Sequence, residues 1–447
     1  MKLCGVDTVD IEPGDVHRWE LSASAPSEPV AVPPSENEKF HLDAVRRHRA
    51  AGWLALALEF DEAVAVDDLT DALRALIDRH EVLRCHFVAD GEEYHRHCVP
   101  AGTVTVTPVP AAPPTGGAAG RLAEGLLAEI ATACSPFTPL HHFFVAVRRP
   151  TSTTLIVAFD HCYVDAYSLA VIAADLADDL AGTPVAQPAS YLDIRTIEES
   201  APVVAADDPR LGAWGEFLAA NDWAVPEFPL DLGLARGETA DVHTDIRTLM
   251  CTASARRFER AVHAVNARTY PALLTAVADA VHDAGGPAEL ATILPVHTRW
   301  GADDRRTVGW LVGNAPIRLS ARAAVGTALR TNSTRLGEAL PLARIGLTPV
   351  YRTYADLIRA NRNDVFMVSY VDYRKLGLPE HISTRQISSS RETDGAQFWF
   401  WRDLDGIHVR TRYPDTPVAH RTMRRVLAAL DARVHHIHAA EPRHRAG

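Results

Sequence analysis

The sequence predicts an α/β protein built from two or three lobes. The chain has 447 residues, 47% of them hydrophobic, which is enough to bury more than one compact core. Short apolar runs typical of buried strands alternate with segments whose apolar residues recur at three and four positions, the helical period. Residues 182–210, rich in Ala, Pro and Asp, separate two such sets. We therefore expect an N-terminal lobe at 1–185 and a C-terminal lobe at 186–447.

Composition narrows the classes of function. The net charge is −12 and the chain shows no basic face of the kind that binds nucleic acid. Six cysteines are scattered without a Cys-x-x-Cys pair, which favours a reducing cytoplasm over a disulfide framework or a structural zinc site. The first residues lack the apolar region of a signal peptide, and no window approaches the roughly 18 apolar residues of a membrane span. We expect a cytoplasmic protein without a nucleic-acid or membrane partner.

In the first lobe, period-two and apolar runs predict strands, and the helical period predicts helices between them. Asp67 or Asp68 is expected to cap the second helix. The expected strands are 53–60, one beginning near Val82, 94–99, 104–109 and 141–148, and the expected helices are 37–48, a segment from 67 or 68 to about 77, and 121–133.

The stretch around residue 161 is the most informative in the chain. Residues 155–159 are five consecutive apolar residues, which predicts a strand buried on both faces. From Ser168 the apolar residues follow the helical period, so a helix is predicted to begin there with Ser168 as its N-cap. The polar loop between them carries His161 and Asp165. A histidine near a helix N-terminus can move a proton beside a developing negative charge, although periodicity alone favours reading both residues as ordinary loop residues.

The second lobe repeats the alternation. Gly182 and Pro184 end the preceding helix, and an aromatic helix near 211–223 opens the new set. Ser254 is expected to cap a helix to about 266, and Pro271 lies in the first turn of the next. Strands are expected at 246–251, 289–296, 369–373 and 397–401.

Four motifs in this order resemble those of the condensation-domain acyltransferases, a superfamily that includes polyketide-associated acyltransferases and chloramphenicol acetyltransferase. The resemblance covers about residues 79–430. The motifs are Arg79-His80-x-x-Leu83-Arg84-x-x-Phe87, His161-x-x-x-Asp165, Arg299 followed by the Val308-Gly309-Trp310 to Arg318 segment, and Tyr413-Pro414-Asp415. His141-His142 does not fit the second motif, because Ala146 stands where its Asp belongs, and we expect both as strand residues on opposite faces.

The resemblance implies a fold and a reaction. The fold is two chloramphenicol-acetyltransferase-like lobes, each a mixed β-sheet flanked by helices, arranged as a V with a central tunnel. In the family an acyl group leaves a thioester for an amine or hydroxyl, and the motif histidine, here His161, acts as general base. Asp165 is expected not as a base but as the partner of Arg299 across the lobes. Loop amides before Ser168 are expected to stabilise the oxyanion.

This sequence departs from the motif at two positions, because Asp160 replaces its first His and Ala166 its Gly. Asp160 either supports structure or alters the pKa of a neighbour. Ala166 matters only if the backbone there requires φ > 0. The residues expected to line the substrate tunnel are Asp160, Ala166, Tyr167, Trp310, Asn314 and Ser369.

The resemblance also implies the partners. We expect a free-standing monomer without a tightly bound cofactor, which takes a phosphopantetheine-linked acyl thioester from a carrier protein or coenzyme A and a small-molecule acceptor, in nonribosomal peptide or polyketide biosynthesis. Two alternatives are a catalytically silent module that recruits carrier proteins, and a hydrolase, for which the chain has no Gly-x-Ser-x-Gly elbow. His435, His436, His438 and His444 lack a second ligand pair, so we expect no metal there.

Overall fold

The computed structural model describes residues 1–5, 9–48, 52–109, 119–200, 204–321, 324–379, 381–389 and 392–439. The chain forms two compact units. The first unit comprises Met1–Pro202, His297–Leu311 and Tyr373–Ser390, and the second comprises Val203–Val296, Val312–Asp372 and Arg391–Gly447. Residues 186–202 are thus grouped with the first unit, and later segments return to it. The division of the sequence at 185/186 stays a prediction.

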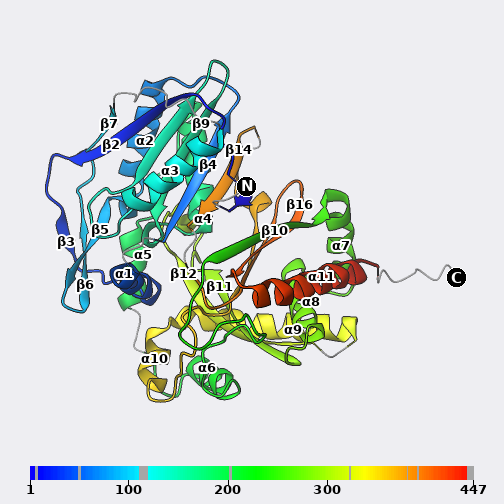
Figure 1. Cartoon of the computed structure of the whole chain (residues 1–447). Helices are drawn as coiled ribbons and strands as arrows, with labels where there is room; N and C mark the ends of the chain where they lie inside the picture. The colour runs from blue at the N-terminus through cyan, green and yellow to red at the C-terminus, as the bar shows by residue number, and fades with distance from the viewer. Residues whose placement is uncertain are drawn as a thin grey trace. The chain divides into compact units, whose positions relative to one another are not determined.

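A seven-stranded mixed sheet organises the first unit (Figure 1). β1 pairs with β14 in parallel, whereas the other neighbouring strands of this sheet pair antiparallel. All eight residues of β9 in the middle of the sheet are buried, which confirms a strand covered on both faces. In spatial order the strands are β1 (Lys2–Cys4), β14 (Ser383–Ser388), β4 (Trp53–Phe60), β9 (Thr153–Asp160), β8 (Phe143–Arg148), β2 (Asp15–Ala23) and β7 (Val104–Val109).

Helices cover both faces of this sheet because alternate residues of β4, β8 and β9 point to opposite sides. Leu126 and Ile130 of α3 (Ala119–Ala133) pack against one set, which includes Ile156 and Ala158. α2 (Val66–Arg79) and α4 (Ala166–Leu180) pack against each other and against strands β7 and β4. The remaining elements of this unit are α1 (Glu36–His48), β3 (Glu28–Val30), β5 (Cys85–Asp90), β6 (Glu93–Cys98) and α5 (Tyr191–Ser200), with 3₁₀ turns at Glu81–Arg84, His161–Tyr163 and Tyr373–Lys375.

The second unit has its own mixed sheet and core. β10 and β15 are antiparallel to β16, and β13 is parallel to β15. Apolar residues of the flanking helices and of the strands form one continuous core. The strands are β10 (Val242–Cys251), β16 (Gly406–Pro414), β15 (Gln397–Arg402), β13 (Val368–Asp372), β11 (Glu289–His297) and β12 (Val312–Ser320). The helices are α6 (Pro209–Ala219), α7 (Thr252–Ala264), α8 (Thr269–Asp283), α9 (Val325–Ala339), α10 (Thr348–Tyr354) and α11 (Pro417–Ala439), with a 3₁₀ turn at Leu340–Ile345. A further 3₁₀ turn, Asp303–Arg306, belongs to the first unit.

Several local predictions need correction. The strand expected from Val82 begins at Cys85, after a 3₁₀ turn whose buried Arg84 donates to the carbonyls of Ile77 and Asp78. α2 begins after Ala65 without a side-chain cap, so neither Asp67 nor Asp68 caps it. His141 and His142 precede β8 and are not strand residues. In the described part of the chain, no helix combines the length and apolar character needed to cross a membrane.

Candidate active site

The candidate site forms where β9 passes into α4. β9 ends at Asp160, a 3₁₀ turn carries His161, and α4 begins at Ala166. The amide of His161 donates to the carbonyl of Gly52 (2.8 Å), at the mouth of β4. The long buried strand and its hydrogen bonds to β4 therefore fix the backbone of the turn on which His161 lies.

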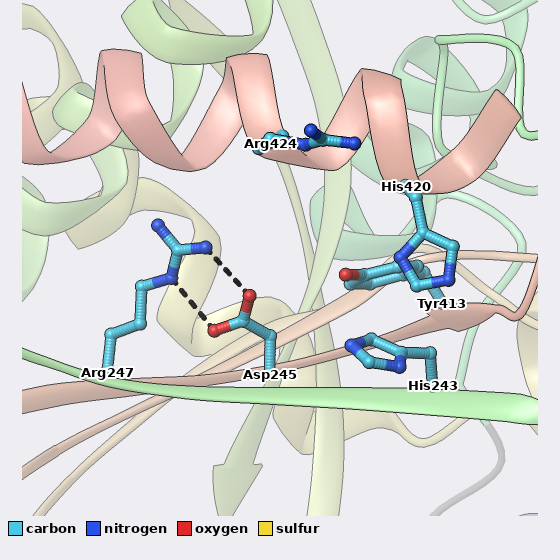
Figure 2. A pocket seen from close by; sticks show the side chains of 6 residues that line it. All are labelled: His243, Asp245, Arg247, Tyr413, His420 and Arg424. Carbon is cyan, nitrogen blue, oxygen red and sulfur yellow. Dashed lines mark hydrogen bonds and ion pairs between the residues drawn. The ribbon is translucent and has the colours of Figure 1, made fainter. Parts of the chain in front are cut away.

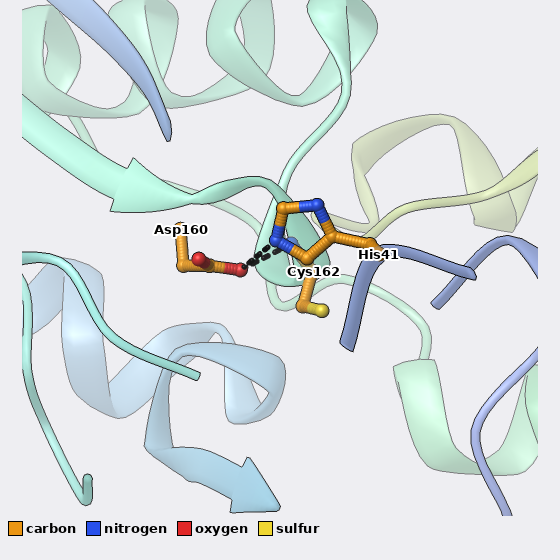
Figure 3. Close-up of side chains that lie close together, drawn as sticks. All are labelled: His41, Asp160 and Cys162. Atoms are coloured by element: carbon orange, nitrogen blue, oxygen red, sulfur yellow. Dashed lines mark hydrogen bonds and ion pairs between the residues drawn. The ribbon is translucent and has the colours of Figure 1, made fainter. Parts of the chain in front are cut away.

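Asp160 anchors this turn from inside the protein. Its side chain is 0% exposed, and its Oδ1 accepts hydrogen bonds from the amide of Cys162 (2.9 Å) and from Nε2 of His41 (2.9 Å). Figure 3 shows the carboxylate of Asp160 facing the imidazole of His41, which comes from α1. The expectation that Asp160 lines a substrate tunnel is wrong, because a completely buried side chain in these contacts supports the turn instead.

Sequence reasoning missed His41. It lies 119 residues before Asp160, and no motif contains it. Its ring fits because Gly52 has no side chain: a Cβ there would come within 2.9 Å of Cε1 of His41. The available signal was indirect. An acid that replaces a motif histidine next to a buried strand needs a polar partner.

Aromatic rings flank His161. Trp310 stacks on its imidazole with ring centroids 4.2 Å apart and planes inclined by 30°. His41 lies 6.1 Å from His161 and 5.9 Å from Trp310, again between centroids. Trp310, which was expected to line the tunnel, thus holds one face of the histidine that was expected to be the base. His161 as a whole residue remains partly exposed.

The surroundings of His161 keep its imidazole neutral at neutral pH. Burial, reinforced by the nearby His41, lowers the pKa of His161 to about 4, whereas Asp160 and Asp165 oppose the shift. Nδ1 of His161 is buried and has no hydrogen-bond partner within the described ranges of the chain. A neutral imidazole has a lone pair that can accept a proton, as a general base requires.

A buried ion pair lies directly after this turn. Nη1 and Nη2 of Arg299 donate to the two carboxylate oxygens of Asp165 at 2.8 and 3.1 Å, and the two residues are 2% and 5% exposed. Both residues belong to the first compact unit, so the expected description of this pair as crossing between lobes needs correction. Nε of Arg299 also donates to the carbonyl of Thr307 (2.9 Å).

Ser168 completes the network. Its hydroxyl lies 2.8 Å from Oδ1 of Asp165, and it accepts from Nη2 of Arg299 (2.9 Å) and from the amide of Gly309 (3.0 Å). The predicted N-cap of α4 was wrong: Asp165 is the cap, and its Oδ1 accepts from the amide of Ser168 at 2.7 Å. That amide is therefore not available to an oxyanion. Asp165 is the cap because its carboxylate can accept hydrogen bonds from the first turn of α4 and from Arg299 at the same time.

Of the other predicted tunnel residues, Ala166 and Tyr167 belong to the first unit, and Asn314 and Ser369 to the second. Ala166 is the first residue of α4 and does not have a positive φ, so its backbone accepts a Cβ without strain. The ring of Tyr167 lies 4.6 Å from the guanidinium carbon of Arg299 and 5.4 Å from the ring of His297. Asn314 on β12 and Ser369 on β13 are partly exposed and belong to the second unit. Their role in substrate binding stays a prediction.

His41, Asp160 and Cys162 also place one nitrogen, one oxygen and one sulfur within 4.8 Å of each other. Cys162 packs against Leu42 and Phe87, and burial raises the pKa of its thiol well above the ordinary value. Because metals bind the thiolate, this set favours the observed hydrogen bonds over a metal ion. At the chain end, Nε2 of His435 lies 3.6 Å from Asp431. The side chain of His438 and the whole of His444 lie outside the described residues.

Comparisons with known proteins identify distant relatives of this chain. A scan against family models found no match. The trehalose-2-sulfate acyltransferase PapA2 of Mycobacterium tuberculosis is 24% identical over 461 aligned residues, which cover 94% of this chain and 93% of PapA2. PapA1 of the same organism, a 2'-acyl-2-O-sulfo-trehalose (hydroxy)phthioceranyltransferase, is 26% identical over 71% of this chain. This chain spans 64% of the length of PapA1.

Solved structures give the same fold. A structure of a PapA2 acyl transferase superimposes with a TM-score of 0.88, at 20% identity, over 98% of this chain and 100% of the other. The first condensation domain of the calcium-dependent antibiotic synthetase superimposes with a TM-score of 0.70, at 17% identity, over 94% and 98%. The chain is thus a distant homologue of the polyketide-associated acyltransferases and shares the chloramphenicol-acetyltransferase-like fold of the condensation domains.

Proposed function

We propose that the chain transfers an acyl group from a phosphopantetheine-linked thioester to a hydroxyl or amine of a small molecule, with His161 as the general base. The observation that carries the proposal is the state of His161. The residue is partly exposed, the pKa of its imidazole is lowered to about 4, and Trp310 and the turn fixed by Asp160 hold it in place. A base for acyl transfer needs an accessible, unprotonated nitrogen in a fixed position.

In the proposed reaction His161 takes the proton of the acceptor O–H or N–H as that atom attacks the thioester carbonyl. The tetrahedral oxyanion then collapses, the C–S bond breaks, and the imidazolium returns the proton to the leaving thiolate. An imidazolium with a pKa of about 4 is a strong acid towards a thiolate, so the lowered value favours this second proton transfer. Asp165, already bound to Arg299 and Ser168, acts as a structural residue.

The relatives favour a hydroxyl acceptor. PapA1 and PapA2 are named for acyl transfer to sulfated trehalose, a disaccharide whose acceptor groups are hydroxyls. Condensation domains of synthetases share the fold at less than 25% identity, so this likeness concerns the fold alone. A carrier-protein donor and a role in peptide or polyketide assembly are therefore part of the proposal. We further propose a cytoplasmic enzyme that takes its donor from a carrier protein or coenzyme A.

One assay separates this function from its rivals. Purified full-length protein is given acyl-coenzyme A or an acyl-loaded carrier protein together with sugar, alcohol and amine acceptors, and both free thiol and acylated acceptor are measured. The proposal expects acylated product from the wild type and at least about a hundredfold less from His161→Ala, the low end for loss of a general base.

The other outcomes contradict the proposal in different ways. Thiol release without acylated acceptor identifies a hydrolase. Binding of the carrier without turnover of any donor identifies a silent recruitment module. A His142→Phe variant is the matched control, because it replaces a second buried histidine, which packs on Tyr163 of the same turn, with a ring of similar shape. It should keep the wild-type rate per folded molecule.

A further inference from the structure

A second group of metal-binding side chains lies in the second unit, where β10, the end of β16 and the start of α11 meet. His243 lies on β10, Asp415 follows β16, and His420 lies in the first turn of α11. One nitrogen or oxygen from each of them lies within 4.8 Å of the others. Nε2 of His420 is 2.6 Å from Oδ1 of Asp415, and the two imidazole centroids are 4.5 Å apart.

Regular hydrogen bonds fix the backbone under all three side chains. His243 is the cross-strand partner of Tyr413 in the antiparallel pair of β10 and β16. The amide of Asp415 donates to the carbonyl of Asp241 at 2.7 Å. Thr416 accepts from the amide of Ala419 at 3.0 Å, which closes the first turn of α11. The three donors can therefore converge on an ion by side-chain rotation alone, without a change of backbone.

The charges around this group favour a cation over an anion. Figure 2 shows the imidazoles of His243 and His420 beside the ring of Tyr413. These side chains line a pocket of about 260 Å³. Asp245 neutralises Arg247 in that pocket through two hydrogen bonds of 2.8 Å. Arg424 is then the one lining guanidinium without an ion pair among the described residues. An anion site normally needs several free cationic donors, and this pocket offers one.

We propose that His243, Asp415 and His420 bind a divalent transition-metal ion, with Zn²⁺ the test case. Two imidazole nitrogens and one carboxylate oxygen are ligands of zinc in proteins, and three protein ligands leave a further position for water. The nearby charge of Arg424 weakens the site, so we expect binding well short of a buried structural zinc site. A bound ion would connect the start of α11 to β10, and by linkage it would stabilise the folded protein.

The test uses the full chain without an affinity tag and ZnCl₂ as the only ligand. Isothermal titration should show one Zn²⁺ site of moderate affinity in the wild type, and the melting temperature should rise with added Zn²⁺. His420→Ala should lose at least about tenfold in affinity. That is the low end for loss of a residue that only orients a ligand, and His420 would be a ligand itself. His243→Ala should act similarly, so that the result does not depend on one variant folding normally.

His435→Ala is the matched control. His435 and Asp431 form a histidine–carboxylate pair on the same helix, 3.6 Å apart and about half exposed. Among the side chains that the structure describes, they belong to no group of three potential metal ligands. This variant should keep the wild-type affinity and the wild-type rise in melting temperature. Unchanged binding in both His243→Ala and His420→Ala, or loss of binding in His435→Ala alone, would overturn the proposal.

Discussion

His161 and His142 share a lowered pKa and differ in their exposure and in the groups that contact them. Burial lowers the pKa of each to about 4. Nε2 of His142 lies 2.7 Å from the carbonyl of Leu83, and the ring packs against Phe144, Phe159 and Tyr163. His161 is partly exposed and stacks on Trp310. A shifted pKa therefore marks burial in both, and accessibility distinguishes the candidate base from the structural histidine.

The largest expected effect separates these two histidines by activity. We predict that His161→Ala leaves the fold intact and lowers turnover at least about a hundredfold, because a general base is lost. His142→Phe should keep turnover per folded molecule and lose stability, on the order of 1–3 kcal/mol, because the carbonyl of Leu83 loses its partner. Steady-state rates with a thioester donor and thermal melts decide both. A His161→Ala variant with most of its activity would remove His161 as the base.

The next effect concerns the support of the site. Asp165→Ala and Arg299→Ala should each destabilise the protein by about 3 kcal/mol, because a buried charge is left without its partner. The double variant should recover part of the summed loss, because neither charge is then stranded. Denaturant unfolding of the two single variants and the double variant measures this. Simple additivity would mean that the two residues do not stabilise each other.

The pH dependence of stability tests the role of His142, the structural histidine of this comparison. The pKa of His142 is about 4 in the folded protein against 6.5 in the unfolded chain, so the unfolded state binds more protons between these values. Stability is therefore complete above pH 6.5 and falls as the pH drops towards 4. At pH 5 the loss from His142 should be on the order of 2 kcal/mol, and His142→Phe should reduce the slope. Equal slopes in wild type and variant would contradict this assignment.

The smallest effect concerns Ala166. Because it begins α4 without a positive φ, Ala166→Gly should destabilise the protein by roughly 0.4–1 kcal/mol through the entropy of the unfolded chain. The added freedom should not raise the rate with acyl chains of any length. Melting temperatures and rates over a series of donors test this. A glycine variant that is both more stable and faster would show that the methyl group strains the site.

The sequence was sufficient where the signal is local. The strands at 53–60 and 104–109 match their predicted ends, and the buried run at 155–159 lies inside β9. The predicted His161 and Asp165 do lie close together, because only a short 3₁₀ turn and the cap residue separate the strand from the helix. Ordered motifs also indicated the family before any geometry was known.

The sequence was insufficient where long-range contacts decide the local structure. Asp165 replaces Ser168 as the cap because Arg299, 134 residues away, holds its carboxylate in place. Asp160 turns inward because His41 comes from a distant helix to meet it. Neither choice is visible in a window of neighbouring residues, since helix propensity and capping preference describe only the local chain.

The dependence of kcat/KM on pH tests the central claim most directly, because it reports ionisations of the free enzyme. Acyl transfer should be measured from pH 4 to pH 8 with wild-type protein and with His142→Phe. If neutral His161 is the base, both proteins should stay active below pH 6 and lose activity on an acidic limb near pH 4, matching the lowered pKa of His161. An acidic limb at pH 6.5 or above in both proteins would contradict the claim that neutral His161 takes the acceptor's proton.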